Sequence, residues 1–173
     1  YGPKLDFMFK DAIGREWQLA TIQCDFNLPE RFELSFANSK NEKERPVVIH
    51  RAIAGSLERF MGIMIEHFAG NFPLWLSPVQ VKILPVSEKH TAYAQKVSAE
   101  LAQNNIRVEL DDSNESLGKR IRVAKTEKVP YLLVLGDKEV GAGTVTAERR
   151  DGAHLDALPL ADFAERAKKE IET

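Results

Sequence analysis

Two prolines in the segment Phe72-Pro-Leu-Trp-Leu-Ser-Pro78 interrupt the sequence where its hydrophobic pattern changes. Proline fixes φ and lacks a backbone N–H, so neither a helix interior nor a central strand is expected to run through this segment. Before it, apolar residues mark long strands and one amphipathic helix, whereas after it short strands alternate with helices. The sequence therefore predicts two domains, residues 1–76 and residues 77–173, joined by a connector in which Trp75 and Leu76 favour packing.

The first domain has the pattern of an antiparallel sheet followed by a long helix. Its predicted strands are residues 5–9, 18–26 and 32–36, with a hairpin turn at 10–14 and a polar loop at 38–44. Apolar side chains then recur at spacings of three and four over residues 51–68, which predicts an amphipathic helix. This helix is expected to begin just after His50 and to end near Gly70.

The second domain alternates strands with helices. The predicted strands are residues 79–84, 106–110, 131–135 and 143–147, and the predicted helices are residues 90–103, 117–128 and 160–171. Such an order predicts a mixed sheet covered by helices. The expected fold class of the whole chain is therefore α/β in the wide sense that includes α+β.

Composition excludes several classes of protein. With 43% hydrophobic residues among 173 the chain can bury a core, and it contains no apolar run of the roughly 20 residues that cross a bilayer. No charged-then-apolar leader is visible, so a cytoplasmic setting and no membrane partner are expected. The single cysteine, Cys24, excludes an internal disulfide and favours core packing. The net charge of −2 means that any RNA binding must be local.

Several short motifs occur together in a fixed order. Gly55-Ser-Leu-Glu-Arg-Phe60 resembles the third signature motif of class II aminoacyl-tRNA synthetases, in which the arginine contacts ATP phosphates. The accompanying motifs are Tyr1-Gly-Pro-Lys-Leu-Asp6, Trp17-Gln-Leu-Ala-Thr-Ile-Gln-Cys-Asp-Phe26, Pro29-Glu-Arg31 and Ile49-His-Arg-Ala52. Together they resemble the bacterial-type threonyl-tRNA synthetase family over essentially the whole chain. The resemblance implies the end of a class II catalytic domain at residues 1–76 and an anticodon-binding domain at residues 77–173.

The resemblance implies roles for polar residues of the first domain in binding ATP, with magnesium, and threonine. Arg59 is the expected contact for ATP phosphates, because its planar fork of donors stays charged and matches phosphate geometry. The other implied residues are Ser56, Gln18, Thr21 and Gln23 for the adenylate, Tyr1 and Gln23 for threonine, and Arg59 with Gln23 for catalysis. Spacing alone would instead favour solvated helix charges and a solvent-facing side of a strand.

His50 is implied to be a zinc ligand. The family holds zinc with one cysteine and two histidines, and His50 corresponds to the last of these. A zinc ion with three protein ligands keeps open positions, which in the family take the amino and hydroxyl groups of threonine, so that valine is rejected. The other two ligands would lie upstream of Tyr1. The chain alone is therefore expected to bind zinc weakly or not at all.

The second domain is implied to read the anticodon of tRNA(Thr). Asn114 and Glu139 are suited to base edges, because an amide donates and accepts while a carboxylate accepts. Arg122 could serve a base or a phosphate. Where the family has an arginine in the last strand, this chain has Glu148. Either the register slips so that Arg149 substitutes, or the anticodon contact differs here. Lys119 and Lys125 lie with Arg122 in the predicted helix 117–128, and for these two lysines a solvated basic face remains an alternative.

Three functions are compatible with these patterns. The first is a piece of a threonine–tRNA ligase, inactive alone and dimeric when complete. The second is an RNA-binding module without aminoacylation activity, because the upstream zinc ligands and the second-motif arginine are absent from this sequence. The third is a synthetase-like regulatory subunit.

Overall fold

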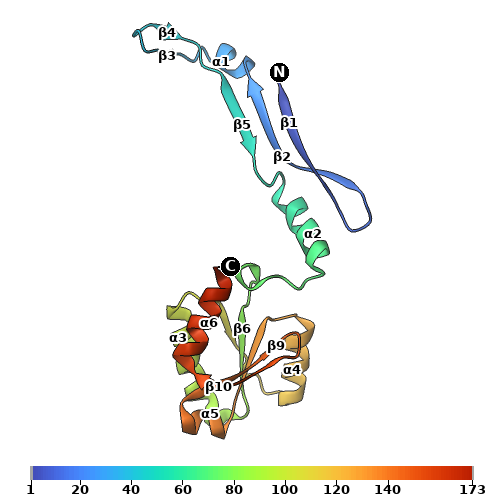
Figure 1. Ribbon diagram of the computed structural model, residues 1–173, viewed down its shortest axis with the longest axis vertical. Helices are drawn as coiled ribbons and strands as arrows, with labels where there is room; N and C mark the ends of the chain where they lie inside the picture. Colours follow the sequence, from blue (N-terminus) through green and yellow to red (C-terminus); the bar gives the residue numbers. More distant parts are fainter. Residues whose placement is uncertain (1, 173) are drawn as a thin grey trace. The chain divides into compact units, whose positions relative to one another are not determined.

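The structure is a computed structural model that describes residues 2–172. The chain divides into two compact units, Tyr1–Gly70 and Asn71–Thr173, and each is described by itself (Figure 1). The second unit begins ahead of the domain boundary predicted at 76/77, because side chains of this unit hold the backbone of the connector. Arg150 donates to Phe72 O, and Gln80 donates to Leu74 O at 2.8 Å. As a boundary between family domains, 76/77 stays a prediction.

The first unit is built on a three-stranded antiparallel sheet of order β1-β2-β5. Its strands are β1 (Lys4–Lys10), β2 (Glu16–Asp25) and β5 (Val48–Ala52). Asp11 closes the β1–β2 turn by accepting hydrogen bonds from the backbone N–H of Ile13 and Arg15 and from Trp17 Nε1. The antiparallel sheet agrees with the predicted fold class.

Between β2 and β5 the structure differs from the predicted strand at 32–36 and loop at 38–44. A short helix, α1 (Asn27–Arg31), follows β2, and a two-stranded ribbon is formed by β3 (Phe36–Ala37) and β4 (Lys43–Glu44). Asp25 starts α1, because its Oδ1 accepts from the N–H groups of Asn27 and Leu28. After α1 the chain turns at Glu33, which has φ +52°, and Leu34 N donates to Pro29 O, so the alternating residues 32–36 do not extend as a strand.

The predicted helix at 51–68 was too long at its start. His50 lies inside strand β5, and helix α2 spans Leu57–Phe68. Ser56 is its N-cap and accepts from Arg59 N at 3.4 Å, a weak form of the usual capping bond. The helix ends as predicted, with Ala69 in the left-handed conformation. None of its residues is buried within the described chain.

The second unit holds a mixed five-stranded sheet of order β10-β9-β8-β6-β7, which confirms the predicted sheet type. Its strands are β6 (Val81–Pro85), β7 (Val108–Leu110), β8 (Tyr131–Leu135), β9 (Thr144–Arg149) and β10 (His154–Pro159). β7, β6 and β8 are parallel, and β9 and β10 continue the sheet in antiparallel fashion. β10 was not predicted from the sequence.

Helices cover this sheet on both faces (Figure 1). They are α3 (Thr91–Gln103), α4 (Leu117–Thr126), α5 (Asp137–Ala142) and α6 (Leu160–Ile171), with 3₁₀ turns η1 (Leu74–Leu76) and η2 (Glu88–His90). Val97 of α3 and Phe163 of α6 join the larger core cluster with Ile83 and Leu133. Ala124 of α4 packs with Leu132 in a smaller cluster on the other face. No helix in residues 2–172 combines the length and apolar character needed to span a membrane.

Lys82, in the central strand β6, is a buried cation with two anionic partners. Its Nζ lies 2.7 Å from both Glu109 and Glu127, and its side chain is 4% exposed. Burial alone would lower the pKa of Lys82, but the hydrogen bonds to Glu109 and Glu127 outweigh it and raise the pKa above its ordinary value. The cation therefore links β6 to β7 and to the end of α4.

Replacing Lys82 with alanine should lower the free energy of unfolding by about 2 kcal/mol, because two half-exposed carboxylates lose their shared cation. Lys82→Met, which retains most of the side-chain volume, should cost less. Since the folded-state pKa is raised, the stabilisation is fully present below the ordinary lysine pKa and is lost as pH rises through the folded value. Urea unfolding of the wild type, Lys82→Ala and Lys82→Met at neutral and alkaline pH measures the stability cost of each substitution and how that cost depends on pH. A stability difference that does not shrink at alkaline pH would contradict this account.

Candidate functional site

A β-bulge in β2 brings three predicted polar residues onto one face of the first sheet. Phe7 pairs with Ala20 and Met8 pairs with Gln18, so Leu19 is an extra residue in β2. The bulge changes the phase of alternation, and Gln18 Nε2 donates to Asp6 Oδ1 at 2.7 Å. Asp6 is itself the cross-strand partner of Thr21. Gln18, Thr21 and Gln23 therefore share a face, although Gln18 and Thr21 are three residues apart and do not follow the two-residue period of a regular strand.

Strand β5 adds His50 to this polar face. His50 is the cross-strand partner of Gln23, and its Nε2 lies 2.8 Å from Asp25 Oδ2. The pKa of the Asp25 carboxyl is lowered by the hydrogen bond to His50 and by the N–H groups of Leu28 and Asn27, against the opposing effect of burial. The His50 side chain is 47% exposed, whereas Asp25 is buried. An ionised carboxylate thus supports a half-exposed imidazole.

Arg59 lies in the first turn of α2 and contacts β2. Its Nη1 donates to Gln18 O at 3.2 Å, and its guanidinium lies 5.5 Å from the centroid of the Trp17 ring. These two contacts leave Nε and Nη2 for an anion. Ser56 is occupied locally, since its Oγ donates to Glu58 at 2.6 Å in addition to capping the helix.

Gly55 permits the close approach of α2 to β2. It has φ +64°, and a Cβ at this position would lie 2.5 Å from Leu19 O. A side chain here would therefore be strained in conformation and would collide with backbone. The glycine of the Gly-Ser-Leu-Glu-Arg motif thus brings the arginine of the motif to Gln18.

Two predictions for the first unit, the threonine contact of Tyr1 and the zinc site, are not tested by the described residues. Tyr1, the other predicted threonine contact, lies outside the described residues. Within residues 2–172, no group of three or more histidine, cysteine, aspartate or glutamate side chains is arranged to hold a metal ion. The role of His50 as a zinc ligand therefore stays a prediction.

In the second unit, Asn114 and Glu139 follow the carboxyl ends of parallel strands. Asn114 is exposed in the loop after β7, and Glu139 lies in α5, just after β8. Glu139 accepts from Gly136 N and from Thr146 Oγ1, each at 2.9 Å. Burial would raise the pKa of Glu139, but these hydrogen bonds outweigh it and hold the pKa below its usual value. The carboxylate is therefore ionised, held in place, and able to accept further hydrogen bonds.

The basic residues of α4, among them Arg120, Arg122 and Lys125, differ in their surroundings. Arg120 is buried and donates to Asp111 O and Pro85 O, each at 2.8 Å, so it is not part of a solvated basic face. Arg122 is exposed. Lys125 forms an ion pair with Glu148 at 2.6 Å. The acidic residue of β9 therefore has a cationic partner on α4.

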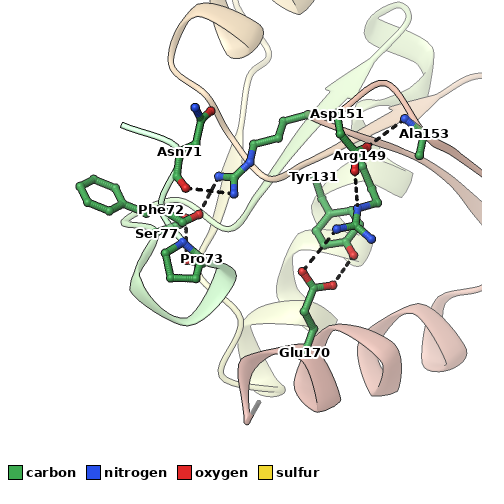
Figure 2. A network of polar contacts seen from close by, with 10 residues as sticks. Asn71, Phe72, Pro73, Ser77, Tyr131, Arg149, Asp151, Ala153 and Glu170 are labelled. Carbon is green, nitrogen blue, oxygen red and sulfur yellow. Dashed lines mark hydrogen bonds and ion pairs between the residues drawn. The ribbon is translucent and has the colours of Figure 1, made fainter. Parts of the chain in front are cut away.

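Arg149 is not brought together with Asn114 and Glu139. It is the cross-strand partner of Tyr131, the first residue of β8, whereas Glu139 follows the last residue of β8. Figure 2 shows Arg149 beside the Tyr131 ring, with Tyr131 Oη donating to Glu170 at 2.5 Å. Burial and this hydrogen bond raise the pKa of Tyr131 to about 12. Arg149 thus lies at the opposite end of β8 from Glu139, and its role as a replacement for the arginine expected at Glu148 stays a prediction.

Sequence reasoning missed Asp25 and Trp17. Asp25 continues the alternation of Thr21 and Gln23 along β2, which is the signal that could have identified it. Trp17 immediately precedes the bulge, and its contact with Arg59 depends on the α2 approach, which no sequence pattern indicated.

Comparisons with known proteins match the two units of the chain to two different families. Residues 1–68 match the tRNA synthetase class II core domain (G, H, P, S and T), and residues 80–170 match the anticodon binding domain. The threonine–tRNA ligase of Caldanaerobacter subterraneus subsp. tengcongensis is 54% identical over 173 residues, 100% of this chain and 27% of the relative. That of Clostridium botulinum strain Hall is 54% identical over 172 residues, 99% of this chain and 27% of the relative.

A solved structure resembles the chain as well. The crystal structure of the RNA binding domain of threonyl-tRNA synthetase from Cryptosporidium parvum Iowa II is 39% identical with a TM-score of 0.87, over 98% of this chain and 43% of that one. The chain thus spans 27% of the length of the two bacterial relatives.

Proposed function

Because the chain belongs to the threonyl-tRNA synthetase family, with a class II core segment followed by an anticodon-binding domain, we propose that it is the C-terminal portion of a threonine–tRNA ligase. In this proposal the complete gene product activates threonine with ATP and magnesium and transfers it to tRNA(Thr). The chain contributes part of the ATP and threonine site and the anticodon reader. The names of the relatives favour this function over an RNA-binding or regulatory module.

The observation that carries the proposal is the polar face of the first sheet, in which the backbone O of Gln18 accepts a hydrogen bond from Arg59. Gln18, Thr21 and Gln23 share that face because of the β2 bulge. We propose that Arg59 binds ATP phosphate oxygens, with its plane oriented by Trp17 and Gln18 O. Gln23 would orient threonine so that its carboxylate attacks the α-phosphate in line, a step that depends on positioning and electrostatic stabilisation.

The other two predicted contacts have smaller roles in this proposal. Ser56 would face the adenylate while it caps α2. Tyr1 stays a prediction for threonine.

His50 is proposed as one of the zinc ligands of the complete site. The fit rests on chemistry, since ligating histidines commonly donate their second ring N–H to a carboxylate, as His50 does to Asp25. The other ligands, a cysteine and a histidine, would come from outside this chain. When bound, zinc would offer positions for the amino and hydroxyl groups of threonine, which valine cannot satisfy.

Asn114, Glu139 and Arg122 are proposed to contact the anticodon. Splayed single-stranded bases are read by hydrogen bonds to their edges, and Glu139 is an ionised acceptor held by Gly136 and Thr146. Arg149 is left out of this set, because its side chain is engaged with Tyr131 and Glu170 at the far edge of the sheet.

The complete gene product is further proposed to be a cytoplasmic homodimer. In support, the first unit leaves large apolar side chains uncovered, among them Phe7, Phe9, Leu57 and Met61, which are 44–67% exposed. Surfaces of this kind are normally buried against other segments or subunits. Sedimentation of the complete gene product tests the oligomeric state.

The anticodon assignment is tested by substituting Glu139 with glutamine. Glutamine keeps the size and one acceptor, and Thr146 can turn its hydroxyl to accept, so the cap of α5 should survive. Binding of a threonine anticodon stem-loop should weaken about 10- to 100-fold, as expected when a base-edge contact worth roughly 1–3 kcal/mol is lost. Fluorescence anisotropy at fixed salt measures this, with Glu165→Gln on the exposed side of α6 as the matched control.

A stem-loop with a changed anticodon separates base reading from phosphate binding. It should bind the wild type weakly and should be nearly insensitive to Glu139→Gln. Equal binding of both stem-loops by the wild type would contradict an anticodon-reading role.

A further inference from the structure

Asp25 is a buried carboxylate whose two oxygens have different partners. Oδ1 accepts from Asn27 N at 2.8 Å and from Leu28 N at 3.1 Å, so the start of α1 fixes the carboxylate. Oδ2 lies 2.8 Å from His50 Nε2. The residue is 2% exposed, whereas His50 is half-exposed. Asp25 therefore fixes the Nε2 side of the His50 ring by a hydrogen bond, while the rest of the ring is open to solvent.

This contact determines which nitrogen of His50 has a free lone pair. An ionised carboxylate can only accept hydrogen bonds, so His50 Nε2 must carry the proton that is shared with Asp25. In the neutral imidazole, Nδ1 is then the unprotonated nitrogen, and only an unprotonated nitrogen can bind a metal ion. We propose that Asp25 is a positioning residue that fixes the Nε2–H tautomer of His50 and so makes Nδ1 the metal-binding atom. The inference rests on the zinc role proposed for His50.

The sheet register supports the same geometry. His50 pairs with Gln23 and Val48 pairs with Asp25 in the antiparallel β2–β5 ladder, so Asp25 and His50 are diagonal neighbours on one face. Both ends of the contact are thus held by backbone hydrogen bonds. A ring fixed in this way loses little freedom when it binds a ligand.

The tautomer is measured on this chain by long-range ¹H–¹⁵N correlation NMR of its histidines, without metal. Wild-type His50 should show a protonated Nε2. In Asp25→Asn, the side-chain oxygen can keep the N–H groups of Asn27 and Leu28, and the amide then presents a donor to Nε2. The proton should therefore move to Nδ1. Asp25→Glu keeps an acceptor and should retain the Nε2–H form, while Asp6→Asn on the same face should leave His50 unchanged.

Zinc affinity of the complete gene product gives the second readout, by competition with a chromogenic chelator. Asp25→Asn should weaken zinc binding about 10- to 100-fold, the usual effect of losing the carboxylate behind a ligating histidine. Asp25→Glu should recover part of that loss. An unchanged tautomer or an unchanged zinc affinity in Asp25→Asn would overturn the role of Asp25. Unchanged zinc affinity in His50→Ala would instead overturn the proposed zinc ligand itself.

Discussion

Replacing Arg59 with alanine is expected to slow threonyl-adenylate formation by the complete gene product about 10²- to 10³-fold, the usual effect of removing one preorganised donor to developing phosphate charge. Threonine binding should change little, because Arg59 contacts β2 at Gln18 O, whereas Gln23 and its partner His50 lie farther along the same strand pair. ATP–pyrophosphate exchange at varied ATP and threonine measures both.

Two control variants separate charge, geometry and folding. Arg59→Lys keeps the charge but loses the planar fork and the stacking on Trp17, so it should recover only a small part of the rate. Arg51→Ala removes an exposed arginine from β5, where alternation points it to the opposite face from His50. It should leave adenylate formation unchanged. Equal loss in Arg51→Ala and Arg59→Ala would mean that the effect is general and not a phosphate contact.

Regular buried elements of the second unit were the most predictable from sequence. Helix α6 and strand β8 have the predicted bounds, because α6 places apolar side chains at helical spacing and β8 is a continuous apolar run buried on both faces. In contrast, α5 and β10 were missed, since neither has a buried apolar stripe. Short elements of this kind are stabilised by caps and by strand pairing, which periodicity does not report.

The start of α2 shows where periodicity misleads. Ile53 fits the helical spacing, yet it is 74% exposed and lies before the helix. The stronger signals were Gly55 and Ser56, a turn residue followed by an N-cap. Given their weight, the helix would have been predicted to begin at Leu57, and Arg51 and Ala52 would have stayed in the strand in which His50 pairs with Gln23.

The candidate site was predictable in its residues and not in its geometry. Gln18, Thr21 and Gln23 came from the motif, but only the bulge at Leu19 places them on one face. Arg149 and Glu148 point to opposite faces of β9. Val145 and Ala147 face the larger core, so Arg149 follows them to that side while Glu148 meets Lys125 on the other. A slip by one residue reverses the face of every side chain in a strand, so Arg149 would point where Glu148 does only if the register of β9 changed.

Gly55→Ala should be as damaging as the loss of Arg59, although it removes no functional group. The new Cβ would lie 2.5 Å from Leu19 O at a φ of +64°, so either β2 or the loop before α2 must move. Displacing a phosphate-binding group by about 1 Å can cost on the order of 10²-fold in rate. Adenylate formation should therefore fall by about that factor, and the apparent melting temperature should also decrease.

Gly62→Ala is the matched control for this prediction, because the same substitution is made in the helix that follows Gly55. Gly62 lies inside α2, and its added Cβ would meet no atom within 4 Å. Alanine is favoured over glycine there by roughly 1 kcal/mol, so this variant should be active and slightly more stable. If Gly55→Ala kept wild-type activity while Arg59→Ala lost it, the arginine could reach phosphate without the close approach of α2 to β2. The glycine of the motif would then serve only the turn, and the position of Arg59 would be determined by Trp17 and Gln18 alone.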